Sequence, residues 1–125
     1  MDQRDVRHWV EDYERVWRTA GTGQLGGLFT EEATYQMSPW EEPVRGVAAI
    51  GELWEAERVG PDEEFTLSSE VVAVDGDVAV VRAEVEYAAT GHRWRDLWVL
   101  RFARDGRCEH FEEWPFAPDQ PDGHD

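Results

Sequence analysis

The sequence predicts an α+β domain in which helices come first and an antiparallel sheet follows. Up to Val59, apolar residues recur every three or four positions, which is the period of a helix. From Phe65 onward they alternate with polar residues, which is the period of a strand. Asp75-Gly76, Thr90-Gly91 and Asp105-Gly106 separate successive alternating runs and predict tight turns. Strands joined by tight turns pair antiparallel, so the helices are expected to cover a meander.

The first predicted helix is Asp2–Ala20, with Asp2 as its cap and Gly21 as its stop. Its apolar stripe comprises Val6, Trp9, Val10, Tyr13, Val16, Trp17 and Ala20. Leu25 and Leu28 indicate a short second helix before a strand within residues 29–37. The expected elements that follow are a loop at 38–46 with an exposed Trp40, and a helix Val47–Val59 ended by Gly60-Pro61.

Four strands are predicted in the second half, Phe65–Val74, Val78–Ala88, Trp94–Ala103 and Arg107–Phe116. Alternation in the last one predicts two sets of side chains. The inward set is Glu109, Phe111 and Glu113, and the outward set is Cys108, His110 and Glu112. Residues 1–116 are therefore expected to form one domain, followed by a disordered, acidic, Pro-rich tail at 117–125.

Composition excludes several classes of function. The 125 residues carry 28 acidic and 12 basic side chains and a net charge of −16, which argues against nucleic-acid and membrane partners. The apolar runs fall far short of the roughly 20 residues that span a bilayer, and the charged N-terminus does not resemble a signal peptide. With Cys108 as the one cysteine, no internal disulfide is possible, and a cytoplasmic location is expected.

The aromatic residues predict a pocket for a small apolar or aromatic ligand. Seven tryptophans in 125 residues exceed ordinary usage, and aromatics fall on the inward faces of several predicted elements. The predicted lining is Tyr13, Trp17, Phe29, Tyr35, Trp54, Trp98 and Phe111. The alternative is that these side chains only fill the core.

Two sets of polar residues are candidates for catalysis. Arg82 and Glu84 share one face of a strand, and Glu113 on the last strand could join them, so that arginine orients a carboxylate acting as general base. A salt-bridge ladder at the rim of the sheet is the alternative. Asp96 and His110, on the two strands of one hairpin, form a second candidate pair, although counting from the turn does not place them opposite each other.

No cofactor or metal is expected. The histidines lack ligand spacing to one another and to Cys108, and neither a phosphate-binding glycine motif nor a G-x-S-x-G sequence is present. The strand at 78–87 is partly apolar on both faces, which is unusual for an antiparallel strand with one side in water. A second copy of the sheet would cover the outer face, so a homodimer is predicted.

The order of motifs resembles the SnoaL-like members of the nuclear transport factor 2-like superfamily. The motifs are F-T-x-x-A-x-Y from Phe29, G-x-x-x-I-x-x-x-W from Gly46, the Asp75-Gly76 hairpin, and F-x-x-D-G-R from Phe102 before a terminal aromatic strand. The resemblance implies a cone of helices packed on a strongly bent, mixed and mostly antiparallel sheet, often dimeric through that sheet. The superfamily includes ketosteroid isomerases, polyketide cyclases, limonene-epoxide hydrolases and binding proteins, so membership alone does not supply the function.

In limonene-epoxide-hydrolase-like members, an Asp–Arg–Asp cluster matches Arg82, Glu84 and Glu113, with glutamate in place of both aspartates. The tyrosine and asparagine that hold the attacking water match Tyr35 and Met37, which adds Met37 to the predicted pocket. A thioether does not hold such a water, so Met37 departs from that pattern. The sequence therefore ranks a small-molecule binding protein first, followed by an isomerase, cyclase or hydrolase with Glu113 as base, and then a protein-interaction module.

Overall fold

The computed structural model of the chain describes residues 1–58, 63–121 and 124. Within these residues, three helices and six strands follow one another in the predicted order, and one of the six strands, a short one, was not predicted. The elements are α1 (Gln3–Trp17), α2 (Leu25–Leu28), β1 (Phe29–Gln36), β2 (Val44–Arg45), α3 (Val47–Glu57), β3 (Phe65–Asp75), β4 (Val78–Tyr87), β5 (Arg93–Phe102) and β6 (Cys108–Phe116).

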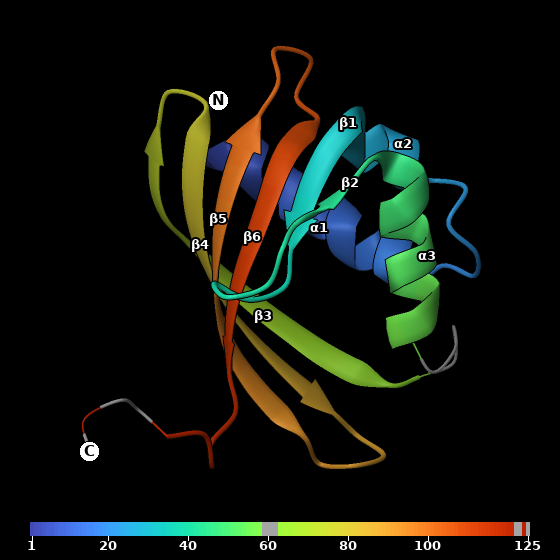
Figure 1. Ribbon diagram of the computed structural model, residues 1–125. Coiled ribbons are helices and arrows are strands. Elements are labelled where there is room, and N and C mark those ends of the chain that lie inside the picture. The colour runs from blue at the N-terminus through green and yellow to red at the C-terminus, as the bar shows by residue number, and fades with distance from the viewer. Residues whose placement is uncertain (59–62, 122–123, 125) are drawn as a thin grey trace.

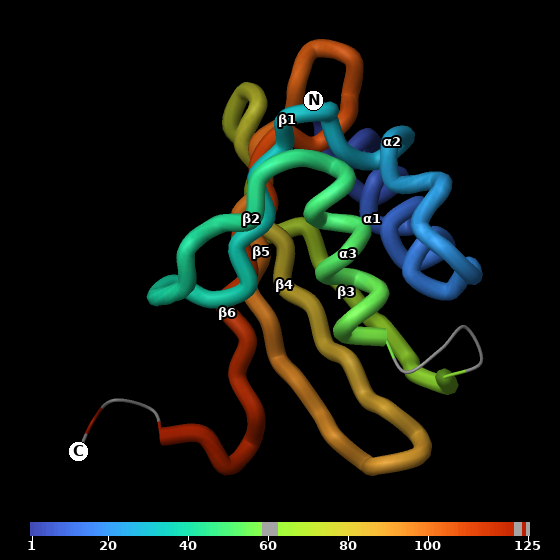
Figure 2. The backbone as a smooth tube through the Cα atoms, turned by 45° about the vertical axis from the view of Figure 1, so that its right-hand side comes forward, coloured from blue at the N-terminus to red at the C-terminus, as the bar shows by residue number. Residues whose placement is uncertain are grey.

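The six strands form one mixed sheet in the order β2-β1-β6-β5-β4-β3. All neighbouring pairs are antiparallel except β1 and β6, which run parallel. Figures 1 and 2 show the strands twisting strongly, with the helices gathered on one side and β3 passing beneath α3. The sheet remains open between β2 and β3. This is the α+β cone that the motif order implied, built on an open sheet instead of a closed barrel.

Helix α1 begins where the sequence predicts. The Asp2 side chain accepts from the backbone N–H of Asp5 at 2.9 Å, and the Asp5 side chain accepts from the backbone N–H of Asp2 at 3.0 Å. This reciprocal capping box satisfies two backbone donors that a helix start leaves unpaired. The helix ends at Trp17, three residues before the predicted end, and Gly21 follows in the left-handed region at φ 76°.

The predicted turns between strands are confirmed. Gly76, Gly91 and Gly106 all have positive φ, a region in which side chains with a Cβ are disfavoured. Helix α3 ends at Glu57, and the predicted stop at residues 60–61 lies outside the described residues. The unpredicted strand β2 lies within the loop before α3, where Val44 pairs with Tyr35.

The core lies between the helices and the inner face of the sheet. Helix α1 contributes Val6, Trp9, Val10 and Val16, and the Trp9 indole donates to the Leu28 carbonyl at 3.0 Å across this layer. Phe29, Trp54, Trp98, Leu100 and Phe111 are the large side chains buried deepest with them. The aromatic stripe of α1 therefore packs directly on the inward residues of β5 and β6.

A β-bulge corrects the predicted faces of the last strand. Arg101 pairs with His110 but Phe102 pairs with Cys108, so Glu109 is an extra residue between two register positions. The extra residue shifts the alternation by one. Cys108 is consequently fully buried, and its predicted outward orientation is wrong. Beyond the bulge, Phe111 is buried as expected.

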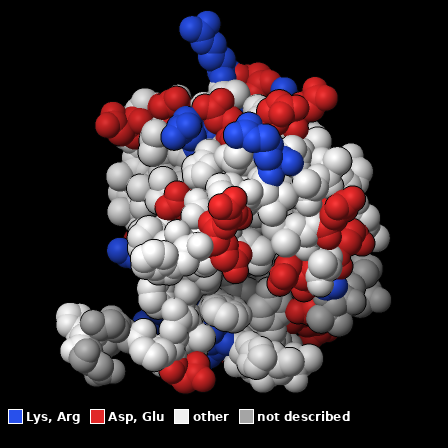
Figure 3. Space-filling model, viewed as in Figure 1, with Lys and Arg blue, Asp and Glu red and all other residues white. Residues whose placement is uncertain are grey.

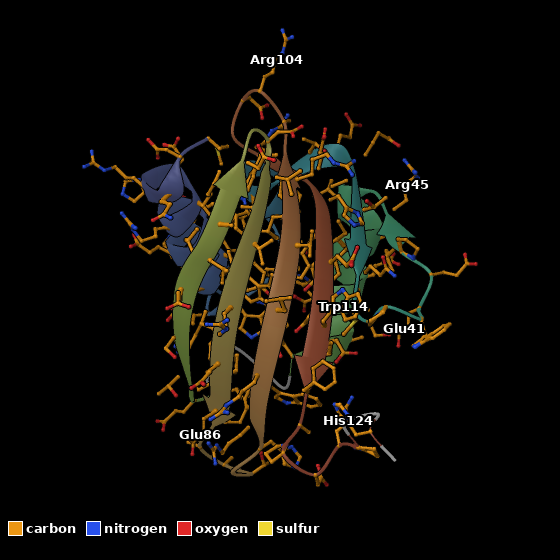
Figure 4. All side chains as sticks on the ribbon, turned by 90° about the vertical axis from the view of Figure 1, so that its left-hand side faces the viewer. Glu41, Arg45, Glu86, Arg104, Trp114 and His124 are labelled. Carbon is orange, nitrogen blue, oxygen red and sulfur yellow. The ribbon has the colours of Figure 1, made fainter. Side chains whose placement is uncertain are left out.

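In the described part of the chain, no helix covers the outer face of the sheet, as Figure 4 shows from that side. Glu86 and Trp114 are labelled on this view, and Trp114 is 39% exposed. The face shown in Figure 3 carries many Asp and Glu side chains and fewer Arg, in line with the net charge. Within the described residues, no helix combines the length and apolar character needed to cross a membrane.

Candidate active site in the aromatic cavity

A cavity of about 260 Å³ lies between the helices and the inner face of the sheet. Its lining is mostly aromatic and aliphatic, with four carboxylic acids. The lining residues are Tyr13, Glu14, Trp17, Tyr35, Met37, Leu53, Trp54, Glu57, Phe65, Leu67, Val85, Tyr87, Trp94, Asp96, Trp98, Glu113 and Pro115. An apolar cavity with a few converging polar groups is the usual form of a small-molecule site.

The structure brings most of the predicted pocket residues together. Tyr13, Trp17, Tyr35, Met37, Trp54 and Trp98 all line the cavity. Phe29 and Phe111 do not, because they lie one layer deeper and are fully buried. Phe111 supports the lining from behind, with its ring stacked on Tyr35 at 4.6 Å and on Tyr13 at 5.6 Å.

Strand register places two acids on the cavity side of the sheet. Asp96 of β5 pairs with Pro115 of β6, and Trp98 pairs with Glu113 two residues along. Asp96 and Glu113 are therefore diagonal neighbours on one face of an antiparallel pair, which is within reach for side chains of this length. On the other side of Asp96 the register partner is Ala83, whose small side chain leaves room above the sheet.

Asp96 is 6% exposed, and its polar surroundings are sparse. Its Oδ2 atom accepts from the Trp98 indole at 3.4 Å, while its Oδ1 atom has no hydrogen-bond partner among the described residues. Two ionised carboxylates cannot hydrogen-bond each other, whereas a proton on Glu113 supplies a donor to the Asp96 carboxylate. The site therefore favours one shared proton for the two acids.

Glu113 is the member of the pair whose pKa is raised. Burial raises the pKa of the Glu113 carboxyl well above its ordinary value, and the adjacent Asp96 and the more distant Glu57 raise it further. The side chain still reaches the cavity surface. A carboxyl that has a raised pKa and is open to a cavity can act as a general acid.

Two tyrosine hydroxyls lie near this pair. The hydroxyl oxygens of Tyr13 and Tyr35 are 3.5 Å apart, and both rings line the cavity. Burial raises the pKa of both phenols, and the acidic groups around them raise it further. Both tyrosines therefore remain neutral and keep a proton that they can donate to a ligand oxygen.

The predicted cluster of Arg82 and Glu84 with Glu113 does not form. Arg82 and Glu84 lie on the outer face of β4, because the residues alternating with them, Ala79, Val81 and Ala83, are the buried ones. Arg82 donates to Glu70 at 2.7 Å, and Glu84 pairs with Arg95 at 3.1 Å. Arg82 and Glu84 therefore form exposed salt bridges, which was the alternative prediction. Of the three residues, Glu113 alone reaches the cavity.

The Asp96–His110 pair does not form either. His110 pairs in register with Arg101 and faces outward, whereas Asp96 faces inward. His110 instead joins a chain of polar contacts on the outer face, with Nδ1 2.6 Å from the Thr34 hydroxyl and Nε2 3.3 Å from Glu112. Asp96 therefore belongs with Glu113, a pair that was not predicted from the sequence. The inward orientation of Asp96 is nevertheless signalled in the sequence, because it lies two residues before the inward Trp98 on the same strand.

A second and larger hollow, of about 540 Å³, lies where β3, β4 and β5 meet residues 116–118. Every residue that lines it is at least partly exposed, and it holds no buried polar group. We therefore assign the candidate site to the smaller aromatic cavity. No group of three or more metal-ligating side chains occurs within residues 1–58, 63–121 and 124.

Comparison with protein families identifies the chain. Residues 10–111 match the SnoaL-like domain model. This protein belongs to the SnoaL-like family. A comparison with curated proteins finds no match.

Solved structures share the fold of this SnoaL-like protein. The epoxide hydrolase/cyclase-like enzyme SalBIII, which functions in pyran ring formation in the polyether salinomycin, is 19% identical, with a TM-score of 0.72 over 92% of this chain and 93% of its own. A candidate polyketide cyclase from Sinorhizobium meliloti is 24% identical, with a TM-score of 0.68 over 90% and 99%. A steroid delta-isomerase from Pseudomonas aeruginosa is 16% identical, with a TM-score of 0.64 over 90% and 80%. At these identities the likeness shows the fold alone.

Proposed function

We propose that this SnoaL-like protein is an isomerase or cyclase that needs no cofactor and acts on a small, ring-containing substrate through an enol. The observation that carries the proposal is the Asp96–Glu113 carboxyl pair in the wall of the aromatic cavity. A site that only binds an apolar ligand needs the cavity but gains nothing from two acids in contact, which costs stability. The pair therefore favours catalysis over the simple binding function that the sequence ranked first.

The roles of the two acids follow from their surroundings. The Asp96 carboxylate removes a proton from the carbon next to the substrate carbonyl, and the carbonyl oxygen becomes an enol oxygen. Glu113 supplies the proton that this oxygen takes up, or Tyr13 and Tyr35 stabilise the oxygen by hydrogen bonds. In an isomerase, the Asp96 carboxyl then delivers its proton to a second carbon, and the enol O–H returns its proton to Glu113, so both acids regain their starting forms. In a cyclase, the enol carbon instead attacks a second carbonyl, the Asp96 proton goes to the oxygen of that carbonyl, and the enol O–H again returns its proton to Glu113.

The size of the cavity limits the substrate. At about 260 Å³ it falls just below the range of about 300–1,000 Å³ for sites of drug-sized ligands. One or two rings with short substituents are therefore the expected extent. The relatives with printed activities, an epoxide hydrolase/cyclase-like enzyme and a steroid delta-isomerase, also have ring-containing products or substrates by name, which supports this class.

Enolisation is tested directly with 1-indanone, a two-ring ketone, in deuterated water. Proton NMR follows the loss of the signal from the hydrogens next to the carbonyl. We expect the wild-type protein to accelerate exchange, and Glu113→Gln and Asp96→Asn to lower that acceleration by about 10² or more. Glu112→Gln, on the outer face of the same strand, is the matched control and should leave exchange unchanged.

Two outcomes contradict the proposal. Exchange that survives in both variants places the chemistry elsewhere. Saturable quenching of tryptophan fluorescence by 1-indanone without any exchange instead supports the binding protein that the sequence ranked first. A protein-interaction module would show neither property.

We further propose that the protein is a homodimer through the outer face of the sheet. Leu97 and Trp114 are 38% and 39% exposed on that face, and a second copy would cover them. Light scattering should give twice the mass of one chain, and Trp114→Arg should lower it to one. A wild-type mass of one chain would overturn the dimer.

The cytoplasmic location stays a prediction, which rests on Cys108 as the one cysteine of the sequence.

A further inference from the structure

We infer that the ligand of the aromatic cavity is a small organic cation, an amine or quaternary ammonium group attached to a ring. The inference rests on the proposed function in using the same cavity, and it names the chemical class of the substrate. Among the described residues that line the cavity, four are acids and none is basic. A neutral apolar ligand would require no such excess of one charge.

Two of the four acids lack a cationic partner inside the described part of the chain. Glu14 is paired with Arg18 at 2.9 Å, so its charge is balanced. Glu57, at the end of α3, is exposed and has no ion pair with any described residue. Asp96 is nine-tenths buried, with its Oδ1 atom unpartnered, and it faces the same cavity. An N–H group of an ammonium ligand, or its positive charge alone, would satisfy that atom.

The aromatic lining is of the kind that binds cations. The faces of tryptophan and tyrosine rings carry negative potential, and cages of such rings recognise quaternary ammonium groups. Two lining rings already hold a guanidinium group within this chain, with Arg18 3.8 Å from the centre of the Phe65 ring and Arg58 5.7 Å from that of Trp17. Arg18 and Arg58 are themselves paired with Glu14 and Glu55, so they leave the interior acids uncompensated.

The net charge of the whole chain also favours a cationic ligand. A net charge of −16 attracts cations to the surface and repels anions, and a cleft lined by one sign of charge concentrates this field. Occupancy by a cation would also favour the ionised form of Glu113. Binding near neutral pH is therefore expected to release a proton, which a neutral ligand would not do.

The test uses two probes of the same shape, (4-hydroxyphenyl)trimethylammonium and its uncharged carbon counterpart 4-tert-butylphenol. Calorimetry at pH 7 should show the ammonium probe binding at least tenfold more tightly. Repetition in buffers of different ionisation enthalpy should show proton release for that probe alone. The Glu57→Gln variant should weaken binding of the ammonium probe several-fold and leave 4-tert-butylphenol unchanged, whereas Glu52→Gln, an exposed position of the same helix outside the cavity, should change neither.

Equal or tighter binding of 4-tert-butylphenol overturns the inference, and so does binding of neither probe. The exchange of 1-indanone separates these results from the fate of the proposed function. If 1-indanone exchange depends on Glu113 but the cation is not preferred, the enzyme stands and its substrate is neutral. If the cation is preferred but no exchange occurs, the ligand class stands and the protein binds without catalysis.

Discussion

Asp96 and Glu113 are diagonal neighbours across β5 and β6, and their carboxyl groups meet on the cavity side of the sheet. The next residue along β6, Trp114, faces the opposite side, and so does the preceding Glu112, whose carboxylate accepts from the Trp114 indole at 2.6 Å. Adjacent glutamates on one strand thus occupy opposite environments. One lies against a second acid in a cavity, and the other accepts hydrogen bonds on the outer face.

The first prediction concerns Glu113→Gln and the dependence of stability on pH. Because the native state keeps a proton on Glu113 to higher pH than the unfolded chain, it binds more protons above pH 4.5. The free energy of unfolding of the wild type therefore falls as pH rises from that value through the raised pKa. Glutamine cannot ionise, so this loss is absent from the variant. At pH 8 the free energy of unfolding of Glu113→Gln should therefore exceed that of the wild type by about 1 kcal/mol or more. Urea denaturation at pH 5 and pH 8 measures this difference, and a variant less stable at both values would contradict it.

The second prediction is the opposite effect at Glu112. The hydrogen bond from Trp114 lowers the pKa of the Glu112 carboxyl, with His110 contributing in the same direction. Its contribution to stability is therefore present above the ordinary value of 4.5 and is lost as pH falls through the lowered pKa. Glu112→Gln should cost about 1 kcal/mol at pH 7 and less at pH 3. The same urea series measures this loss of unfolding free energy. A loss that became larger toward low pH would show that the hydrogen bonds do not depend on the charge of the Glu112 carboxylate.

The sequence was sufficient to predict most of the elements, because local rules decide them. Turns at Gly76, Gly91 and Gly106 require positive φ, and the apolar stripe of α1 requires a helix. Motif order then supplied the cone-like arrangement. Of the eight pocket residues predicted from the sequence, six line the cavity, since the inward face of a helix or strand is a local property of its sequence.

The site itself was harder to predict, because it depends on long-range geometry. The bulge at Glu109 is not signalled by any residue of β6, yet it sets which side chains face the core. Arg82 and Glu84 fit a catalytic spacing, but the small residues alternating with them, such as Ala83, fill the inner face instead. Asp96 and Glu113 meet because of the β5–β6 register. A shift of that register by one residue would place the two side chains on opposite faces of the sheet.

The third prediction compares Phe111 and Trp40. Phe111 is fully buried, and its ring is stacked on Tyr13 and Tyr35, so Phe111→Ala would leave a void behind the cavity wall. We expect it to lower the free energy of unfolding by about 3–5 kcal/mol. Trp40 is 98% exposed, and Trp40→Ala should change that free energy by less than about 0.5 kcal/mol. Thermal unfolding followed by circular dichroism measures both, and a large loss at Trp40 would show that its ring is covered, as in an assembly of two chains.

The last prediction tests whether Arg82 lies outside the site. Its guanidinium donates to Glu70 across two exposed side chains, and pairs of this kind contribute about 0–1 kcal/mol. Arg82→Gln should therefore leave the acceleration of 1-indanone exchange within about twofold of the wild type, whereas Asp96→Asn should lower it by about 10² or more. Light scattering on both variants separates any effect on assembly from an effect on the cavity. If Arg82→Gln lost exchange while keeping the wild-type mass and stability, Arg82 would have to act on the acid pair through the sheet, and the separation of the two faces described above would fail.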